Sequence, residues 1–371
     1  MMPFVPISLI LLGVAPSVAV CRRRSPICGW SARPEPRCFS EWRAADCRVT
    51  VLSMRLFVKS LLLLLAGGVF FAFAGLVAVW APDKALDQLK GRWAKPPSQF
   101  LVVDGMQVHL RDEGPRDDPQ PLVLIHGTSD SLHTWDAWTT ALKPQRRVIR
   151  FDLPGFGLTG PRPDNDYSIQ RYVAFTGALL DRLGVQRCVL VGNSLGGEIA
   201  WASALAMPQR VQKLVLVDAA GYPLAAQEVP LAFRLAQTKS VRWLFENVLP
   251  RGLVQTSLRN VYGDPTKVTP ELVDRYYDMA LRAGNRQALG YRIDMAGVDS
   301  SQDIKALTQP TLLLWGALDR LTPVQSGQRF ARDIAGARLV VFEGLGHLPH
   351  QEDPVQTVAE VKRFLGLGLA N

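Results

Sequence analysis

The longest apolar run in the chain is Leu61–Trp80, twenty residues without a charged or strongly polar side chain. As a helix it would reach about 30 Å, the thickness of the hydrocarbon core of a bilayer. It predicts a membrane-spanning helix and, with its flanks, a single-pass N-terminal anchor over residues 54–81. A cleaved signal peptide, and hence a secreted protein, is the alternative, because Ala72-Phe73-Ala74 offers a cleavage site.

The orientation of this helix does not follow from its flanks, because basic residues lie on both sides of it. Arg55 and Lys59 precede the apolar run, and Lys84 and Lys90 follow it. We expect the rest of the chain on the non-cytoplasmic side, since a short N-terminal segment usually stays inside.

The segments on either side of the anchor carry no clear period. Residues 1–53 mix Arg, Pro, Cys and Trp, so we expect them to be unstructured or absent from the native protein, which would then start at Met54. Residues 82–98 contain three prolines and predict a linker, in which Trp93 is suited to an interfacial position.

A regular alternation of apolar runs and helical patterns begins near Gln99. An Asp-Gly turn within Phe100–Leu110 predicts a hairpin, and most of the later apolar runs are continuous, as in strands buried on both faces. The expected fold class is α/β, a mostly parallel sheet covered by helices on both faces. The strand-like runs are Pro121–Ile125, Val148–Phe151, Cys188–Val191, Leu214–Val217, Thr311–Trp315 and Leu339–Phe342, and the helix-like stretches are Ile169–Leu183, Glu198–Met207, Val324–Ile334 and Val355–Leu365.

Residues 222–309 interrupt this alternation, because they contain helix-like stretches and no strand-like run. The stretches are Leu231–Gln237, Val241–Leu249 and Leu272–Ala283. We expect a helical insertion between two parts of one core, residues 99–221 and 310–371. Most aromatic residues of the insertion should pack it against the sheet.

Composition and charge exclude several classes. Apolar residues make up 48% and charged residues 20% of the 371 residues, which is neither a disordered nor a fibrous composition. The net charge is +9, but residues 1–53 hold seven Arg against three acidic residues, and no long basic run follows. We therefore expect no nucleic-acid partner.

Four of the five cysteines, Cys21, Cys28, Cys38 and Cys47, lie before residue 50. They form no C-x-x-C pair and have no neighbouring His, so we expect no zinc site, whereas a disulfide framework stays open. Cys188 is the fifth, so residues 54–371 hold no internal disulfide.

The clearest chemical motif follows the strand-like run Cys188–Val191. Gly192-Asn193-Ser194-Leu195-Gly196 is a G-x-S-x-G motif between a buried strand and a helix. In that context the glycines allow a tight turn that exposes the serine at the positive end of the helix. Ser194 is therefore the candidate nucleophile.

A nucleophilic serine needs a base, and the base needs an orienting acid. His347 follows the last strand-like run and can reach back over the sheet edge, whereas His350, near the next helix, is more naturally structural. Asp319, on the turn after Thr311–Trp315, is the candidate acid, and Asp218 at an earlier strand end is the alternative.

The oxyanion of an acyl-transfer intermediate needs two backbone N–H donors. Leu195 follows the nucleophile and supplies one, and Thr128, after the first parallel strand, supplies the other. His126, at the end of that strand, is expected to brace the oxyanion loop rather than to act in catalysis.

These residues resemble the α/β-hydrolase family, in its cap-bearing branch, over about residues 99 to 367. The matching motifs, in family order, are His126-Gly127, Asp152–Gly157, Gly192–Gly197, Asp319–Pro323 and Gly346-His347. The resemblance implies an eight-stranded sheet, a helical cap between strands six and seven, the triad Ser194, Asp319 and His347, and hydrolysis without cofactor or metal. Epoxide hydrolases and haloalkane dehalogenases of this branch use an aspartate nucleophile, so Ser194 argues against both.

Among the serine members we expect a carboxylic ester hydrolase acting on an apolar acyl or aryl ester, similar to membrane-tethered monoacylglycerol lipases. An anchor suits an enzyme whose small-molecule substrate partitions into lipid. The alternative is a carbon–carbon bond hydrolase of a meta-cleavage product, in which Asn193 is frequent. That group, however, has a glycine-rich stretch where His126–Ser131 stands, and Trp where Leu348 stands.

A non-catalytic hydrolase-fold binding protein is a further possibility, which covalent labelling by a fluorophosphonate would distinguish. The sequence leaves the acyl preference and the oligomeric state open.

Overall fold

A computed structural model of the protein describes residues 38–223, 239–296 and 299–368. Contacts between residues divide the chain into two units, one that ends at Phe70 and one that begins at Phe71. Helix α1 (Cys38–Val79) begins in the first unit and ends in the second. Its residues Leu52–Val77 form a helix where the apolar run predicts one, and by length and composition this helix could cross a membrane.

The helix begins earlier than the apolar run alone predicts. Residues 38–53 are helical, so the expectation of an unstructured segment up to residue 53 is wrong for this part. The stretch contains neither Pro nor Gly, and the prolines that precede it are Pro34 and Pro36. Nothing in it therefore stops the apolar helix from extending toward the N-terminus. Residues 1–37 lie outside the described part, as do Cys21 and Cys28.

The segment expected to be a linker contains a helix, α2 (Leu86–Trp93). Leu89 and Trp93 are buried and pack with Met279 of the insertion. The indole Nε1 of Trp93 donates to Oδ2 of Asp278 at 2.8 Å. The predictions of a linker and of an interfacial Trp93 are therefore wrong, because Leu89 and Trp93 recur at helical spacing and form a buried face.

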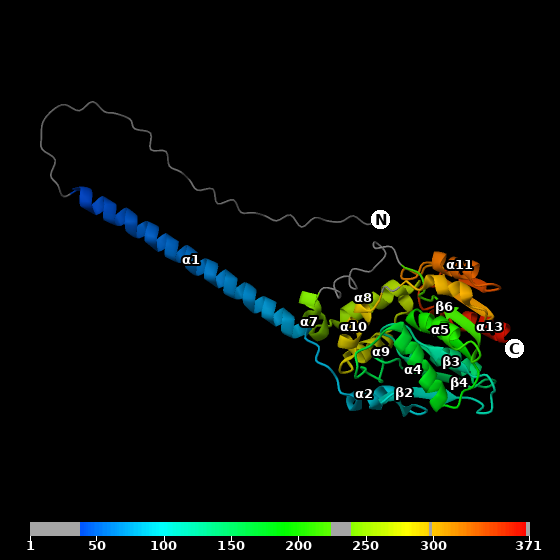
Figure 1. Ribbon diagram of the computed structural model, residues 1–371. Helices are drawn as coiled ribbons and strands as arrows, with labels where there is room; N and C mark the ends of the chain where they lie inside the picture. Colours follow the sequence, from blue (N-terminus) through cyan, green and yellow to red (C-terminus); the bar gives the residue numbers. More distant parts are fainter. Residues whose placement is uncertain (1–37, 224–238, 297–298, 369–371) are drawn as a thin grey trace, which may run out of the picture. The chain divides into compact units, whose positions relative to one another are not determined.

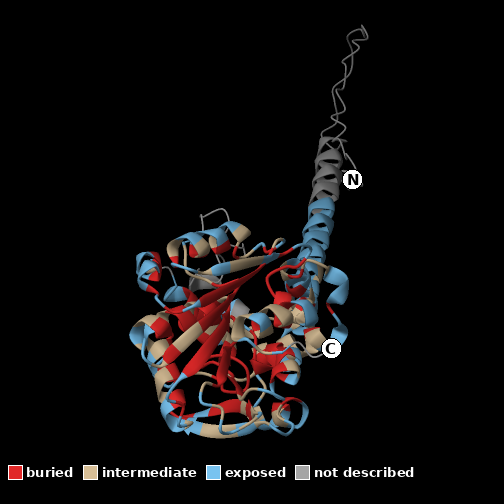
Figure 2. Cartoon of the chain, turned by 90° about the vertical axis from the view of Figure 1, so that its right-hand side faces the viewer, coloured by how far each residue is buried: buried red, intermediate tan, exposed pale blue. Residues whose placement is uncertain are grey.

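The second unit is built on an eight-stranded sheet in the order β1-β2-β4-β3-β5-β6-β7-β8 (Figure 1). Its first two strands form an antiparallel hairpin, the second is also antiparallel to β4, and all other neighbours are parallel. Every residue of β3, β4, β5 and β7 is buried, as the continuous apolar runs predict (Figure 2). The strands are β1 (Gln99–Val103), β2 (Met106–Glu113), β3 (Leu122–Ile125), β4 (Val148–Phe151), β5 (Cys188–Asn193), β6 (Val211–Val217), β7 (Thr311–Gly316) and β8 (Arg338–Phe342).

Helices cover both faces of the sheet, and alternate strand residues feed two apolar clusters. Val123 and Leu190 pack on the side of α4, α5 and α11, whereas Leu122 and Val189 pack on the side of α3 and α13. This is the two-layer covering that the α/β pattern predicts. The helices are α3 (Asp136–Leu142), α4 (Ile169–Arg182), α5 (Leu195–Ala206), α11 (Val324–Asp333) and α13 (Pro354–Leu365), with two short elements, η1 (Leu132–Trp135) and α12 (Pro349–Glu352).

Between β6 and β7 the described residues form helices and no strand. These are α7 (Lys239–Asn247), α8 (Arg251–Val261), η2 (Pro265–Lys267), α9 (Pro270–Leu281), α10 (Asn285–Asp294) and η3 (Ser301–Ala306). We refer to this segment as the cap; Figure 1 shows α7 to α10 gathered on one side of the sheet. The predicted helices Val241–Leu249 and Leu272–Ala283 correspond to α7 and α9, and Leu231–Gln237 lies outside the described residues.

Candidate active site

Ser194 lies on the turn between the buried strand β5 and helix α5. Its backbone has φ 54° and ψ −120°, a strained combination for a residue other than glycine. The N–H of Ser194 donates to the carbonyl of Val217 at 3.1 Å, so the neighbouring strand holds the turn in place. A Cβ on Gly192 would overlap the carbonyl oxygen of Gly196, which explains the glycine there. The motif thus forms the sharp strand-to-helix turn that presents a serine at a sheet edge.

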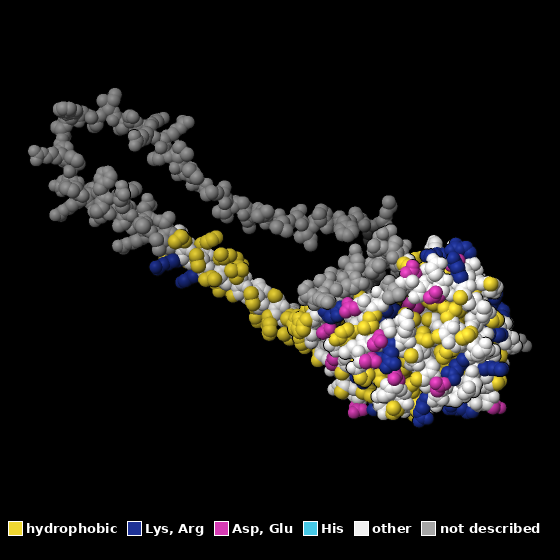
Figure 3. Space-filling view, in the orientation of Figure 1, with side chains coloured by type: hydrophobic (Ala, Val, Ile, Leu, Met, Phe, Trp, Pro, Cys, Tyr) yellow, Lys and Arg dark blue, Asp and Glu magenta, His cyan; other side chains and the backbone are white. Residues whose placement is uncertain are grey.

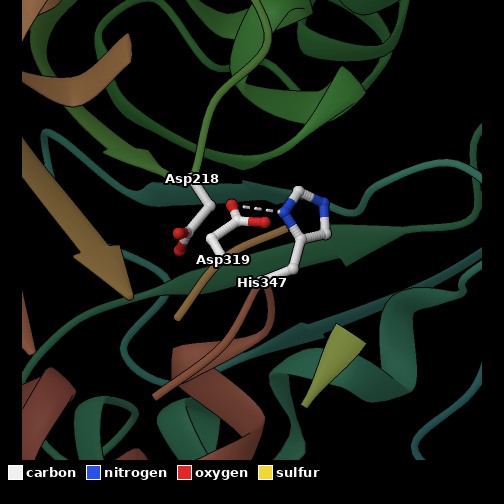
Figure 4. A group of neighbouring side chains, drawn as sticks. All are labelled: Asp218, Asp319 and His347. Carbon is white, nitrogen blue, oxygen red and sulfur yellow. Dashed lines mark hydrogen bonds and ion pairs between the residues drawn. The ribbon is translucent and has the colours of Figure 1, made fainter. Parts of the chain in front are cut away.

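Asp319 and His347 form a hydrogen-bonded pair on the loops after β7 and β8. Nδ1 of His347 lies 2.8 Å from Oδ2 of Asp319 (Figure 4). Oδ1 of Asp319 accepts the N–H groups of Leu321 and Thr322 at 2.7 and 3.1 Å, which fixes the carboxylate plane. Burial alone would raise the pKa of Asp319, but His347 and these hydrogen bonds bring it below its ordinary value. The pair therefore combines an ionised acid with an oriented imidazole.

Asn193 connects the serine turn to the histidine loop. Its Nδ2 donates to the carbonyl of Val217 and to that of His347, both at 3.1 Å. Ser194 and His347 consequently lie on adjoining backbone segments at the carboxyl edge of the sheet. The sequence indicates no structural role for Asn193, which is marked only by its position before the candidate nucleophile.

Asp218, the alternative acid, lies directly after β6 and is completely buried. Its Oδ1 accepts the N–H of Gly316 at 2.9 Å, and its Oδ2 has no partner among the described residues. Ligating atoms of Asp218, Asp319 and His347 lie within 4.8 Å of one another. Burial, and then the charge of Asp319, raise the pKa of Asp218 well above its ordinary value. The surroundings thus favour the neutral form of Asp218 and the ionised form of Asp319, and Asp319 bonds to the histidine.

The loop after β3 passes close to Ser194. A Cβ on Gly127 would lie 3.1 Å from Cβ of Ser194, so only glycine permits this approach without a shift. Within the described part of the chain, no acceptor is paired with the backbone N–H of Thr128 or of Leu195. Both N–H groups are therefore free to donate to a ligand beside Ser194.

His126 fixes the start of this loop, as its position predicts. Its Nε2 accepts the N–H of Leu153 at 2.9 Å. That contact puts the ring proton on Nδ1, which donates to the carbonyl of Gly127 at 2.7 Å. His126 is completely buried and braces the loop.

The cap is hydrogen-bonded to the histidine loop at the end of α8. The N–H of His347 donates to the carbonyl of Val261 at 2.7 Å. The buried carboxylate of Glu352 accepts the N–H groups of Gly263, Asp264 and Gly346 at 3.0, 2.7 and 2.9 Å. The sequence does not predict this role of Glu352, because nothing in its polar neighbourhood indicates that its carboxylate binds backbone N–H groups of distant segments.

A second polar network joins α9 to the oxyanion loop. Tyr276 donates to Oδ2 of Asp130 at 2.7 Å, and Nε2 of Gln351 donates to the same oxygen at 3.1 Å. Gln351 also bonds Thr134, whose Oγ1 lies 2.8 Å from Nε2 of His350. Burial, followed by the neighbouring His347 and Arg275, keeps the pKa of His350 well below its ordinary value.

His350 is therefore a buried structural histidine, and its ring stacks on Trp135 with centroids 4.2 Å apart. Its packing agrees with the choice of His347 over His350 as the candidate base.

Comparison with known proteins places the chain in a family. The chain is 30% identical over 281 residues to 2-hydroxy-6-oxo-2,4-heptadienoate hydrolase of Pseudomonas putida, covering 72% of this chain and 95% of that protein. It is also 30% identical over 274 residues to a 2-hydroxymuconate semialdehyde hydrolase of Pseudomonas putida, covering 71% and 92%.

A solved structure, a membrane phospholipase A described as a bacterial virulence factor, matches with TM-score 0.62 and 25% identity over 86% of this chain and 98% of that one. A meta-cleavage product hydrolase matches with TM-score 0.62 and 27% identity over 72% and 97%. The model of the alpha/beta hydrolase fold family matches residues 120–354. The chain is a hydrolase of the alpha/beta hydrolase fold family, as its motifs predict.

Proposed function

We propose that the protein is a serine hydrolase that cleaves carboxylic esters of apolar acyl or aryl substrates, with Ser194, Asp319 and His347 as its catalytic triad. The observation that carries the proposal is the 2.8 Å contact between His347 and Asp319 beside a strained serine turn. A histidine with a purely structural role would not require a strained turn nearby. The strained backbone at Ser194 holds its hydroxyl at the sheet edge.

The reaction proceeds through an acyl-enzyme. Oγ of Ser194 attacks the ester carbonyl carbon while Nε2 of His347 takes the hydroxyl proton. The N–H groups of Thr128 and Leu195 bind the oxyanion of the tetrahedral intermediate. The intermediate expels the alcohol, which takes the proton from His347. Water then attacks the acyl group in the same way and restores Ser194.

Two observations support an apolar ester as the substrate. A cavity of 30 Å³ beside the oxyanion loop is lined largely by apolar groups such as Phe156, Met279 and Leu289. Asp130 and Arg286 also line it, one acidic and one basic residue, so the support for an apolar substrate comes from the apolar groups. The match to a membrane phospholipase A covers 86% of this chain, against 72% for the meta-cleavage product hydrolase, which supports a lipid-like ester.

We also propose that Leu52–Val77 is a single-pass anchor, with the catalytic unit outside the cytoplasm. The span contains no charged residue from Leu61 onward, and a cleaved signal is the alternative. Protease accessibility in intact cells tests the orientation, and N-terminal sequencing tests cleavage.

Active-site labelling tests the proposed chemistry. The full-length protein in detergent should react with a fluorophosphonate at Ser194 and hydrolyse p-nitrophenyl esters of increasing chain length. Ser194→Ala should lose the label and at least about 10³-fold in kcat, because only oxyanion binding would remain. A non-catalytic binding protein would show neither labelling nor turnover.

A second candidate is carbon–carbon bond cleavage of a meta-cleavage product, because relatives with that activity in their names are 30% identical. In this chain Leu348 packs with Leu258, Tyr262, Val268 and Val273 of the cap instead of supplying the Trp of that group. Loss of the dienoate absorbance at a higher kcat/KM than any ester would favour the second candidate.

A further inference from the structure

Two tryptophans on the surface of the second unit touch each other at the end of α1. The rings of Trp80 and Trp243 lie 5.9 Å apart between centroids, at an interplanar angle of 53°. Their exposed fractions are 43% and 58%, and the adjacent Leu244 is 42% exposed. Trp80 follows α1, and the other two residues belong to α7 of the cap. We call Trp80, Trp243 and Leu244 the tryptophan patch. Figure 3 shows the hydrophobic side chains that cover the apolar helix before it.

Backbone hydrogen bonds fasten the patch to the exit of the apolar helix. The N–H of Ala81 donates to the carbonyl of Asn247 at 3.0 Å, and that of Leu249 donates to the carbonyl of Val79 at 3.3 Å. Trp80 and Val248 form an antiparallel bridge between these two bonds. The end of α7 is therefore held at the residue where the chain leaves its apolar helix.

The position of the patch relative to the apolar segment identifies what covers it. The apolar segment ends at Val77, three residues before Trp80, so a bilayer that contains the segment has its surface at the level of the patch. Tryptophan is enriched at that level, because its ring is apolar and its N–H still reaches water or headgroups. Aqueous exposure of two adjacent indoles and a leucine is otherwise unfavourable.

We propose that the tryptophan patch contacts the lipid bilayer, and that the cap thereby receives its substrate, a membrane lipid ester, from the lipid phase. The proposal rests on the proposed ester hydrolysis and on the anchor, and it adds the substrate class and the route of entry. The connection to the site runs through the cap, because Val261 at the end of the next helix bonds to His347.

Fluorescence quenching tests the contact without relying on catalysis. The full-length protein is reconstituted into vesicles of phosphatidylcholine, with or without bromine on the acyl chains. Trp243→Phe should remove a component of emission that the brominated lipid quenches. In Val355→Trp, whose position on α13 is 78% exposed, the added emission should not be quenched. If the brominated lipid does not quench the Trp243 component, the proposal is overturned. It is also overturned if a second copy of the protein covers Trp243, which would be seen as a cross-linked dimer that is lost in Trp243→Phe.

Kinetics test the route of entry. The double variant Trp243→Ser, Leu244→Ser should hydrolyse a short p-nitrophenyl ester at the wild-type rate but lose at least about fivefold on monoacylglycerol in vesicles, because it seats less well on lipid. The matched control Val355→Ser should change neither rate. Equal rates of the double variant and the wild type on vesicles would refute entry from lipid. Absence of Ser194 labelling in the wild type would instead refute the proposed function, and the quenching result would still stand.

Discussion

The substitution Asp319→Asn tests which of the two carboxyl groups of the site, that of Asp319 or that of Asp218, orients His347. In the wild type, Oδ1 of Asp319 accepts two backbone N–H groups, and Oδ2 faces Nδ1 of His347. An asparagine must keep its carbonyl oxygen toward the two N–H groups, so its amide NH₂ would face the imidazole. That arrangement removes the proton from Nδ1 and places it on Nε2, the atom that must accept the proton of Ser194.

The expected loss follows from that wrong tautomer. The same change in a Ser-His-Asp triad lowers kcat by about 10⁴-fold, which corresponds to roughly 5 kcal/mol of transition-state stabilisation. The fold should survive, because an amide has the shape of the carboxylate and keeps its two backbone bonds. Activity should recover partly at high pH only if hydroxide bypasses the base.

Asp218→Asn is the matched control. Burial and then the charge of Asp319 raise the pKa of Asp218, which favours its neutral form, and an amide is nearly isosteric with a neutral carboxyl group. It keeps the bond from Gly316 and should change kcat by less than about threefold.

The assay is hydrolysis of p-nitrophenyl butyrate by the three full-length proteins in detergent, with circular dichroism as the check on folding. A large loss in Asp218→Asn together with a small one in Asp319→Asn would show that the acid follows β6, and the reasoning from the 2.8 Å contact would be refuted.

Three further predictions follow from buried groups. The pKa of Asp218 is raised in the folded state, so its contribution to stability is complete below about pH 4 and declines as pH rises toward the folded pKa. Asparagine does not titrate, so the melting temperature of Asp218→Asn should rise relative to that of the wild type as pH increases. Trp93→Ala should cost about 3 kcal/mol in chemical unfolding, because Trp93 is buried, whereas exposed Trp243→Ala should cost under about 1 kcal/mol. Glu352→Gln puts an NH₂ group against at least one backbone N–H, so it should lower the free energy of unfolding by about 1–3 kcal/mol, seen as a lower melting temperature, and should also lower kcat. The control Glu343→Gln, on the surface, should change neither stability nor kcat.

Much of the sheet follows from the sequence because its strands are buried on both faces. A continuous apolar run such as Cys188–Val191 has a single interpretation once helix-like stretches flank it, and β5 begins at Cys188 and ends two residues after the run, at Asn193. The hairpin turn at Asp104-Gly105 is equally local, since its positive φ angles require such residues.

The short helices were harder to predict, because tertiary contacts decide them. Helix α2 has eight residues, too few to be stable alone, and it forms because Leu89 and Trp93 pack against Leu158 of the core and Met279 of the cap. Pro82, Pro96 and Pro97 mark its surroundings as irregular and conceal the helix between them.

The candidate site divides in the same way. Ser194, Asp319 and His347 each follow a strand-like run, and the carboxyl ends of parallel strands meet at one edge, so their proximity is predictable. Glu352 and Asn193 act through backbone groups of distant segments, and no local pattern encodes which carbonyl or N–H a side chain will reach.

The contacts between cap and core constrain how substrate can enter. The end of α8 is bonded to His347 and, through Glu352, to the backbone beside it, so a motion of that end would displace the candidate base. Helix α9 is bonded to Asp130 on the loop that carries Thr128, so its motion would displace a proposed oxyanion donor. Entry that preserves the catalytic geometry must therefore use the part of the cap that bonds to neither loop. Helix α7 meets that condition, since the contacts described for it are with α10 and with Trp80, directly after α1, and this is the side on which the tryptophan patch lies.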